Sequence, residues 1–151
     1  MKIHHTFDLT PFTTLRLRSR VSAWCRVASV GDLEQAIDYA AAQRLPLVPL
    51  GDGSNVVADE SVHALVASIE LRGVDLVEET DDSVLVDVAA GENWHAWVMY
   101  SLQRGWYGLE NLALIPGRVG AAPIQNIGAY GVEVASFIDS VRYICAKTKR
   151  E

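Results

Sequence analysis

The chain has 151 residues, of which 50% are hydrophobic and 21% are charged, a composition that excludes an intrinsically disordered protein. Its net charge of −6 provides no attraction to nucleic acid or to an anionic membrane, so we expect neither as a partner. The start of the chain lacks a signal-peptide pattern, and its apolar runs are far shorter than the ~20 residues of a membrane span. We therefore expect a cytoplasmic protein.

Two cysteines, Cys25 and Cys145, lie far apart in the sequence. No CxxC pair or cluster of histidine and cysteine accompanies them, and no histidine pair has metal-binding spacing. We expect two reduced thiols and no metal site.

The first half of the chain reads as an α/β unit. Residues 22–28 are typical of a strand, and a helix is predicted over residues 32–44 with Ser29 as its N-terminal cap. The short apolar run 46–50 predicts a buried strand that leads directly into the glycine loop 51–55. The order strand, helix, strand, glycine loop suggests an α/β unit.

The second half begins with two predicted strands, residues 64–69 and 83–89. The acidic segment 75–83 between them is interpreted as the solvated connection of a hairpin, not as a carboxylate site. Residues 92–103 predict an amphipathic helix, and Gly105 suits the left-handed residue that often follows a helix.

The C-terminal stretch 137–146 predicts another strand, followed by the charged residues 147–151. A strand needs a hydrogen-bonded partner, and no further element follows this one in the sequence. We therefore expect the chain to be a truncated piece of a longer protein, with a complete small domain as the alternative.

The loop 51–55 is a candidate phosphate-binding turn. Its two glycines permit unusual backbone angles and a close approach of N–H groups to an anion, and Ser54 and Asn55 add side-chain hydrogen bonds. The Asp52 carboxylate would repel a phosphate, so we expect its side chain to face away. The loop matches neither standard nucleotide fingerprint, and a purely structural turn remains the alternative. If the backbone does approach a ligand, Gly53→Val should abolish binding.

The segment 116–131 is the stronger candidate. Four of its residues are glycines, namely Gly117, Gly120, Gly128 and Gly131. Because each glycine costs conformational entropy on folding, so many of them favour backbone packed against a flat ligand over a compact structural loop. The small Ala121 and Ala122 fit that interpretation. Gln125 and Asn126 would hydrogen-bond the polar edge of a heterocycle, and Tyr130 would stack on it or donate its hydroxyl.

Four stretches together resemble the UDP-N-acetylenolpyruvoylglucosamine reductase (MurB) family: TTLRL at 13–17, LGDGSN at 50–55, AGENWH at 90–95 and GLENLALIPGRVGAAPIQNIGAYGVE at 108–133. The resemblance implies an α+β FAD-binding fold of the vanillyl-alcohol-oxidase (PCMH) type with two small α+β subdomains. Residues 1–70 would form the first subdomain and residues 71–151 an incomplete second one. The family's separate substrate domain would be absent.

The resemblance also implies which residues bind FAD. The loop that contacts the pyrophosphate would comprise Leu50, Gly51, Asp52, Gly53, Ser54 and Asn55. The flavin and its ribityl–phosphate arm would be contacted by Gly117, Gly120, Ala121, Ala122, Gln125, Asn126, Gly128, Ala129, Tyr130 and Gly131. The chain departs from the family's usual pattern at Asp52, where glycine is usual, and at Arg118, where small residues are common.

The reaction implied by the resemblance is a two-step hydride transfer in peptidoglycan synthesis. NADPH reduces FAD, and the reduced flavin then reduces the enolpyruvyl group of a UDP-sugar to give UDP-N-acetylmuramate. The family's catalytic arginine, serine and glutamate have no counterpart in this chain, so no catalytic residue is assigned and the chain alone is not expected to be catalytically competent. The alternatives are a flavin- or nucleotide-binding module without catalysis, and a structural domain, against which the glycines and Gln125–Asn126 argue. The oligomeric state is not predicted.

Overall fold

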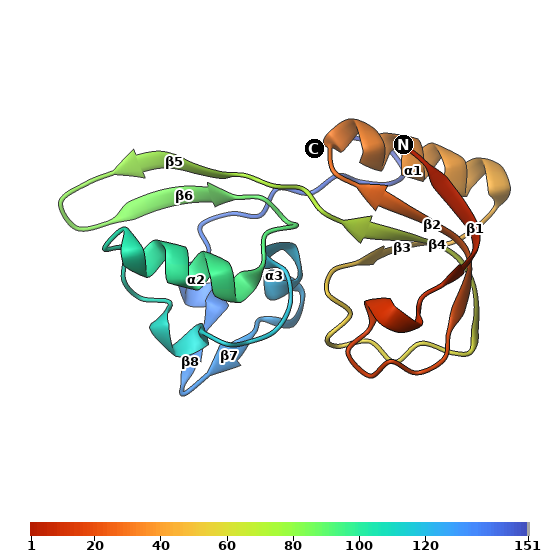
Figure 1. The fold of residues 1–151 in the computed structure, drawn as a ribbon. Coiled ribbons are helices and arrows are strands. Elements are labelled where there is room, and N and C mark those ends of the chain that lie inside the picture. The colour runs from red at the N-terminus through yellow and green to blue at the C-terminus, as the bar shows by residue number, and fades with distance from the viewer. Residues whose placement is uncertain (151) are drawn as a thin grey trace. The chain divides into compact units, whose positions relative to one another are not determined.

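The computed structural model describes residues 1–150, which form two compact units (Figure 1). The first unit contains Met1–Leu71 and the tail from Tyr143, and the second contains Arg72–Arg142. Each unit combines helices and strands and has its own hydrophobic core.

The first unit is built on a four-stranded sheet with the order β1-β2-β4-β3. Its strands are β1 (Ile3–Asp8), β2 (Arg20–Val27), β3 (Leu47–Leu50) and β4 (Ser61–Ile69). Both β2 and β3 run parallel to β4, and α1 (Val30–Gln43) forms the crossover between β2 and β3. The predicted strand–helix–strand order is confirmed. The strand β1, which pairs antiparallel with β2, was not predicted.

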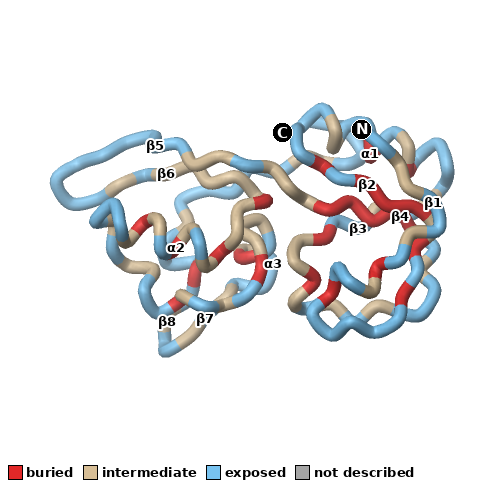
Figure 2. The backbone as a smooth tube through the Cα atoms, viewed as in Figure 1, coloured by how far each residue is buried: buried red, intermediate tan, exposed pale blue. Residues whose placement is uncertain are grey.

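Both faces of this sheet are covered by apolar side chains, and the central strands β2 and β4 are largely buried (Figure 2). One face packs Cys25 and Leu65 against α1, and the other packs Trp24 and Val66 against Leu50. A register shift in β2 between Val21 and Ala23 marks a bulge, which lets Val21 and Trp24 share a face although they are three residues apart.

The second unit starts with the antiparallel hairpin of β5 (Val74–Glu79) and β6 (Val84–Val88). The acidic segment 75–83 is thus mostly strand, and only residues 80–83 form the turn. Its interpretation as the hairpin connection between strands 64–69 and 83–89 was wrong, because β6 pairs with β5 and β4 lies in the sheet of the first unit. The acidic residues Asp75, Glu78 and Glu79 on a solvated ribbon hid the strand. The predicted amphipathic helix is confirmed as α2 (Trp94–Gln103), and Gly105 after it has φ +77°.

The rest of the second unit is made of short elements around α2. They are α3 (Ala122–Gln125), β7 (Gly128–Ala129), β8 (Val132–Glu133) and 3₁₀ turns at Glu110–Leu112, Val119–Ala121 and Val134–Phe137. Trp94, Val98 and Leu112 form the centre of the core. The predicted strand over 137–146 is wrong, because within residues 1–150 no other segment pairs with it; the stretch ends instead in a turn where Lys149 N donates to Cys145 O.

The helix α1 is capped as its sequence predicts. Asp32 N donates to Ser29 Oγ at 3.1 Å, and the Asp32 carboxylate in turn accepts from Ala28 N at 3.1 Å. These reciprocal bonds satisfy backbone donors that the first helical turn leaves free. They also hold the pKa of Asp32 below its ordinary value, chiefly through the bond from Ala28 N.

Removing the cap should destabilise the first unit measurably. We expect Ser29→Ala to lower the free energy of unfolding by about 1 kcal/mol, because Asp32 N loses its acceptor. Urea unfolding followed by circular dichroism measures the change. Ser140→Ala, an exposed serine outside any helix or strand, is the control and should leave stability unchanged; equal effects from both would contradict the capping role.

The two thiols, both in the first unit, should differ sharply in reactivity. Burial raises the pKa of the Cys25 thiol to about 11, whereas a hydrogen bond with the Thr148 side chain lowers the pKa of Cys145. Since the thiolate is the nucleophile, a disulfide reagent at about pH 8 should label Cys145 quickly and Cys25 only after unfolding. Cys145→Ser should remove the fast phase of labelling, and Cys25→Ser should not. A fast phase that persists in Cys145→Ser would refute the assignment.

Candidate cofactor-binding site

The loop 51–55 leaves the carboxyl end of β3, the edge of a parallel sheet at which α/β proteins bind ligands. Leu50 is buried beneath it, whereas Asn55 is exposed and Ser54 is half-buried. The loop therefore offers polar side chains at its surface and is anchored by Leu50, the residue that precedes it.

Gly53 docks this loop on the N-terminal segment. It has φ +63°, and a Cβ atom at this position would lie 2.3 Å from Phe12 O and 2.9 Å from Thr13 Cα. Thr14 N donates to Gly53 O at 3.1 Å across the same contact. The stretches 13–17 and 50–55, singled out separately in the sequence, are thus one structural feature. The chain's own backbone already requires glycine here, and the requirement expected from a ligand stays a prediction.

In the second unit, the segment from Gly117 to Gly120 lies antiparallel to residues 90–94. Trp94 N donates to Gly117 O at 3.0 Å, and Gly120 N donates to Ala90 O at 2.9 Å. A Cβ atom on Gly120 would lie 2.6 Å from Ala90 Cβ, so only glycine allows this approach. The stretches 90–95 and 117–120 are therefore also paired. Arg118 is accommodated because its Nη1 donates to Gly91 O at 2.7 Å.

The neighbouring residues of the candidate segment have different surroundings. Ala121 and Gln125 are exposed, whereas Ala122 is buried in the core with Trp94. Asn126 ends α3 in the left-handed conformation, and its side chain bonds within the unit: Nδ2 donates to Glu133 Oε2 at 2.8 Å and Oδ1 accepts from Ala135 N at 3.1 Å. Gln125 thus points its amide to solvent, while the Asn126 amide stabilises the turn.

The segment finishes in the hairpin of β7 and β8. Tyr130 and Gly131 form its two-residue turn with φ of +52° and +79°, the angles of a type I′ turn. Gly128 again lies too close to backbone for a side chain, since its Cβ would be 2.9 Å from Val132 O. The Tyr130 side chain is 89% exposed at the hairpin tip. The left-handed backbone conformation is strained for a tyrosine. Ala129 is half-buried beside it.

An acidic side chain anchors the loop before the candidate segment. Glu110 Oε2 accepts a hydrogen bond from Gly108 N at 2.8 Å. Trp94 Nε1 donates to Leu112 O at 2.7 Å from the core side. No pattern in the sequence predicts this second contact, because an indole in an amphipathic helix ordinarily indicates packing alone.

Comparison with known proteins identifies the family. Residues 21–150 match the family described as "FAD binding domain". The chain belongs to the FAD-binding domain family. The predicted α+β FAD-binding fold is thereby confirmed.

The relatives agree with the resemblance noted in the sequence. The UDP-N-acetylenolpyruvoylglucosamine reductase of Chromobacterium violaceum is 43% identical over 95% of this chain and 41% of its own length, and that of Bordetella pertussis is 50% identical over 89% and 38%. The crystal structure of UDP-N-acetylenolpyruvylglucosamine reductase from Thermus caldophilus superposes with a TM-score of 0.65 at 25% identity, over 89% of this chain and 45% of that one. The chain thus spans about two fifths of the length of the curated relatives it matches.

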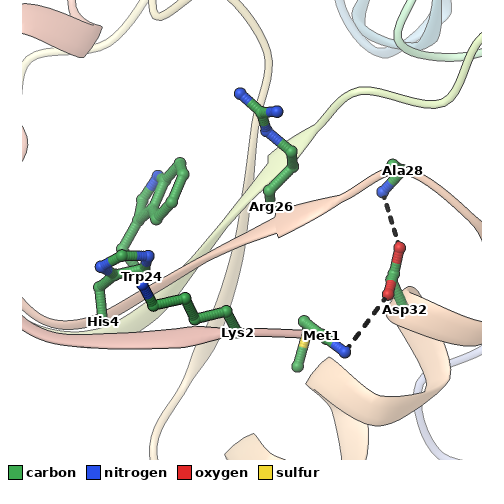
Figure 3. A pocket seen from close by; sticks show the side chains of 7 residues that line it. All are labelled: Met1, Lys2, His4, Trp24, Arg26, Ala28 and Asp32. Carbon is green, nitrogen blue, oxygen red and sulfur yellow. Dashed lines mark hydrogen bonds and ion pairs between the residues drawn. The ribbon is translucent and has the colours of Figure 1, made fainter.

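A separate pocket of about 470 Å³ in the first unit contains none of the predicted cofactor residues (Figure 3). Met1, Lys2, His4, Trp24, Arg26, Ala28 and Asp32 line it. Three of its charged groups are paired: the N-terminal amine lies 3.7 Å from the Asp32 carboxylate, and Arg26 Nε lies 3.0 Å from Glu70. We therefore assign this pocket no function.

Within residues 1–150 no three histidine, cysteine or acidic side chains come together in a way that would hold a metal ion. In the same part of the chain, no helix has the length and apolar character needed to cross a membrane.

The contact at Gly53 predicts a stability defect that comes with any binding defect. We expect Gly53→Ala to lower the free energy of unfolding of the first unit by about 1–3 kcal/mol through overpacking, in addition to the strain of its positive φ. Gly105→Ala, with φ +77° and no heavy atom within 4 Å of the added carbon, carries the strain alone. Urea unfolding measures the loss in free energy of unfolding for both variants, and the difference between the two losses gives the cost of the close contact. Equal losses would show that Phe12 and Thr13 move aside without cost.

Proposed function

We propose that this chain is the FAD-binding part of an NADPH-dependent reductase that converts UDP-N-acetylglucosamine enolpyruvate to UDP-N-acetylmuramate. That reaction would place it in the cytoplasm, in peptidoglycan synthesis, and hence in the maintenance of cell shape and in cell division. The observation that carries the proposal is the similarity over 89–95% of the chain to reductases of this name, which includes both glycine loops. The UDP-sugar and NADPH would be its small-molecule partners, without nucleic acid or membrane.

The local geometry fits FAD in both units. Gly53, Gly120 and Gly128 hold their loops by contacts that leave no space for a side chain. Among the exposed residues of the predicted set are the polar or aromatic side chains of Asn55 in the first unit and of Gln125 and Tyr130 in the second. A polar loop at a strand end suits a pyrophosphate, and an exposed amide and an exposed aromatic ring suit a heterocycle.

Within this proposal the predicted site residues take two roles. Gly51, Asp52, Ser54 and Asn55 would surround the pyrophosphate, while Leu50 and Gly53 fix the loop to the sheet and to the N-terminal segment. In the second unit Gly117, Gly120, Ala122, Asn126, Gly128 and Gly131 would set the backbone path, and Ala121, Gln125, Ala129 and Tyr130 would face the flavin. Bound FAD would supply the hydride chemistry, which the protein itself cannot supply. The division of the chain into subdomains 1–70 and 71–151 belongs to the same proposal.

A flavin-binding module without catalysis is the second candidate. It is favoured by one observation: the family that residues 21–150 match is described by FAD binding alone. The gene sequence downstream of the codon for Glu151 separates the two candidates, because only the reductase requires the chain to continue into a substrate domain. We expect the chain to take up FAD without turnover on its own.

Uptake of flavin by the purified chain tests the proposal directly. After incubation with FAD and gel filtration, the protein should carry yellow flavin absorbance. Riboflavin, which lacks the pyrophosphate, should be retained less well. A chain that stays colourless at high FAD concentration would refute the proposed function.

Tyr130 provides the matched test of the second loop. We expect Tyr130→Ala to weaken FAD binding about tenfold, because a stacked aromatic ring contributes on the order of 1 kcal/mol beyond its buried area. Tyr107→Ala removes another exposed tyrosine of the same unit that lies outside the predicted set, and should leave the Kd unchanged. Fluorescence titration of FAD gives both values, and equal Kd values for the two variants would exclude Tyr130 from the site.

A further inference from the structure

Leu114 has two unfavourable properties at once. Its φ is +64°, in the left-handed region that is strained for a residue with a side chain. Its side chain is also 78% exposed, so burial does not offset the strain. Among the described non-glycine residues with positive φ, only Leu114 and Tyr130 are large, exposed and apolar or aromatic.

The first turn of α2 holds Leu114 in this conformation. Leu114 N donates a hydrogen bond to His95 Nδ1 at 3.2 Å. On either side of it, Trp94 Nε1 donates to Leu112 O at 2.7 Å and Trp94 N donates to Gly117 O at 3.0 Å. The chain is thus fixed before, at and after Leu114, and the His95 imidazole supplies the middle contact.

Backbone strain persists only where the surrounding structure imposes it, and such positions cluster at ligand sites. The loop with Leu114 continues after two residues into Gly117, where the proposed cofactor segment begins. The ring system of a flavin is flat and carries an apolar dimethylbenzene end, which a leucine side chain can cover. An exposed apolar side chain beside a flavin segment therefore has a ligand of matching chemistry.

We propose that Leu114 contacts the isoalloxazine ring of FAD and that His95 is a positioning residue that holds Leu114 against it. The inference rests on the proposed function, since it requires FAD on the second unit. It adds two residues, His95 and Leu114, that lie outside the set of FAD-binding residues implied by the resemblance.

The first test separates strain from binding in the full 151-residue chain. Leu114→Gly should raise the Tm by about 2 °C, because glycine accepts the left-handed conformation, and should weaken FAD binding about tenfold through the lost apolar contact. Arg44→Gly is the matched control, since Arg44 ends α1 in the left-handed conformation with φ +54°. It should raise the Tm similarly and leave the Kd for FAD unchanged.

The second test examines His95. His95→Leu removes the acceptor of Leu114 N and should weaken FAD binding to the level of Leu114→Gly, with a shift in the visible spectrum of the bound flavin. His95→Asn keeps an acceptor oxygen near the position of Nδ1 and should retain most of the affinity. In the Leu114→Gly background His95→Leu should have no further effect, because no side chain remains to be positioned.

The outcomes distinguish this inference from the proposed function. If the unaltered chain takes up no FAD, the proposed function fails and this inference fails with it. If the chain binds FAD and Leu114→Gly binds it equally well, only the inference is overturned. A loss of affinity from His95→Leu that is equal in both backgrounds would show that His95 has a general structural role and would also overturn it.

Discussion

Each unit of this chain depends on a place where two backbone segments approach more closely than a side chain allows. At Gly53 the glycine loop meets Phe12 and Thr13, and at Gly120 the second loop meets Ala90. A Cβ atom at either glycine would lie within 2.6 Å of its neighbour, well inside van der Waals contact. Because each contact joins two sequence stretches, it explains why the stretches 13–17 and 50–55, and likewise 90–95 and 117–120, occur together.

The second unit shows how little regular structure such an arrangement needs. Between residues 105 and 137 its helices and strands are only two to four residues long. Backbone groups that a long helix or sheet would satisfy are paired instead with the backbone of residues 90–94 and with the side chains of Trp94 and Glu110. The core around Trp94, Val98 and Leu112 lies at the centre of these bonds, so one helix, α2, supplies both the packing surface and several of the anchors.

The regular elements were predictable because their hydrophobic periods are strong, as in β2, α1 and α2. The strand β1 was missed because His4, His5 and Thr6 interrupt its pattern, and because its stability comes from pairing with β2 and from the rings of Phe7 and Trp24, which stack at 4.5 Å. The strand over 137–146 was wrongly predicted for the converse reason: its composition suits a strand, but local composition does not supply a hydrogen-bonded partner. For the candidate site, the sequence located both loops but not the neighbours that require their glycines, because those neighbours are distant in sequence.

The distinction between local causes and contacts distant in sequence also applies to residues in the left-handed conformation. Arg44 and Asn126 end helices, and Gly131 completes a hairpin turn, so for each of them the positive φ has a local structural cause. At the hairpin tip, asparagine or glycine would satisfy the turn with less strain than Tyr130 does. Leu114 lies in the turn that follows the 3₁₀ helix Glu110–Leu112, where glycine or asparagine would accept the positive φ with less strain, and His95 from another element holds its backbone N–H. Folding alone would favour smaller or more permissive residues at both positions, and the contacts with FAD proposed for Tyr130 and Leu114 would account for the exposed ring and the exposed leucine.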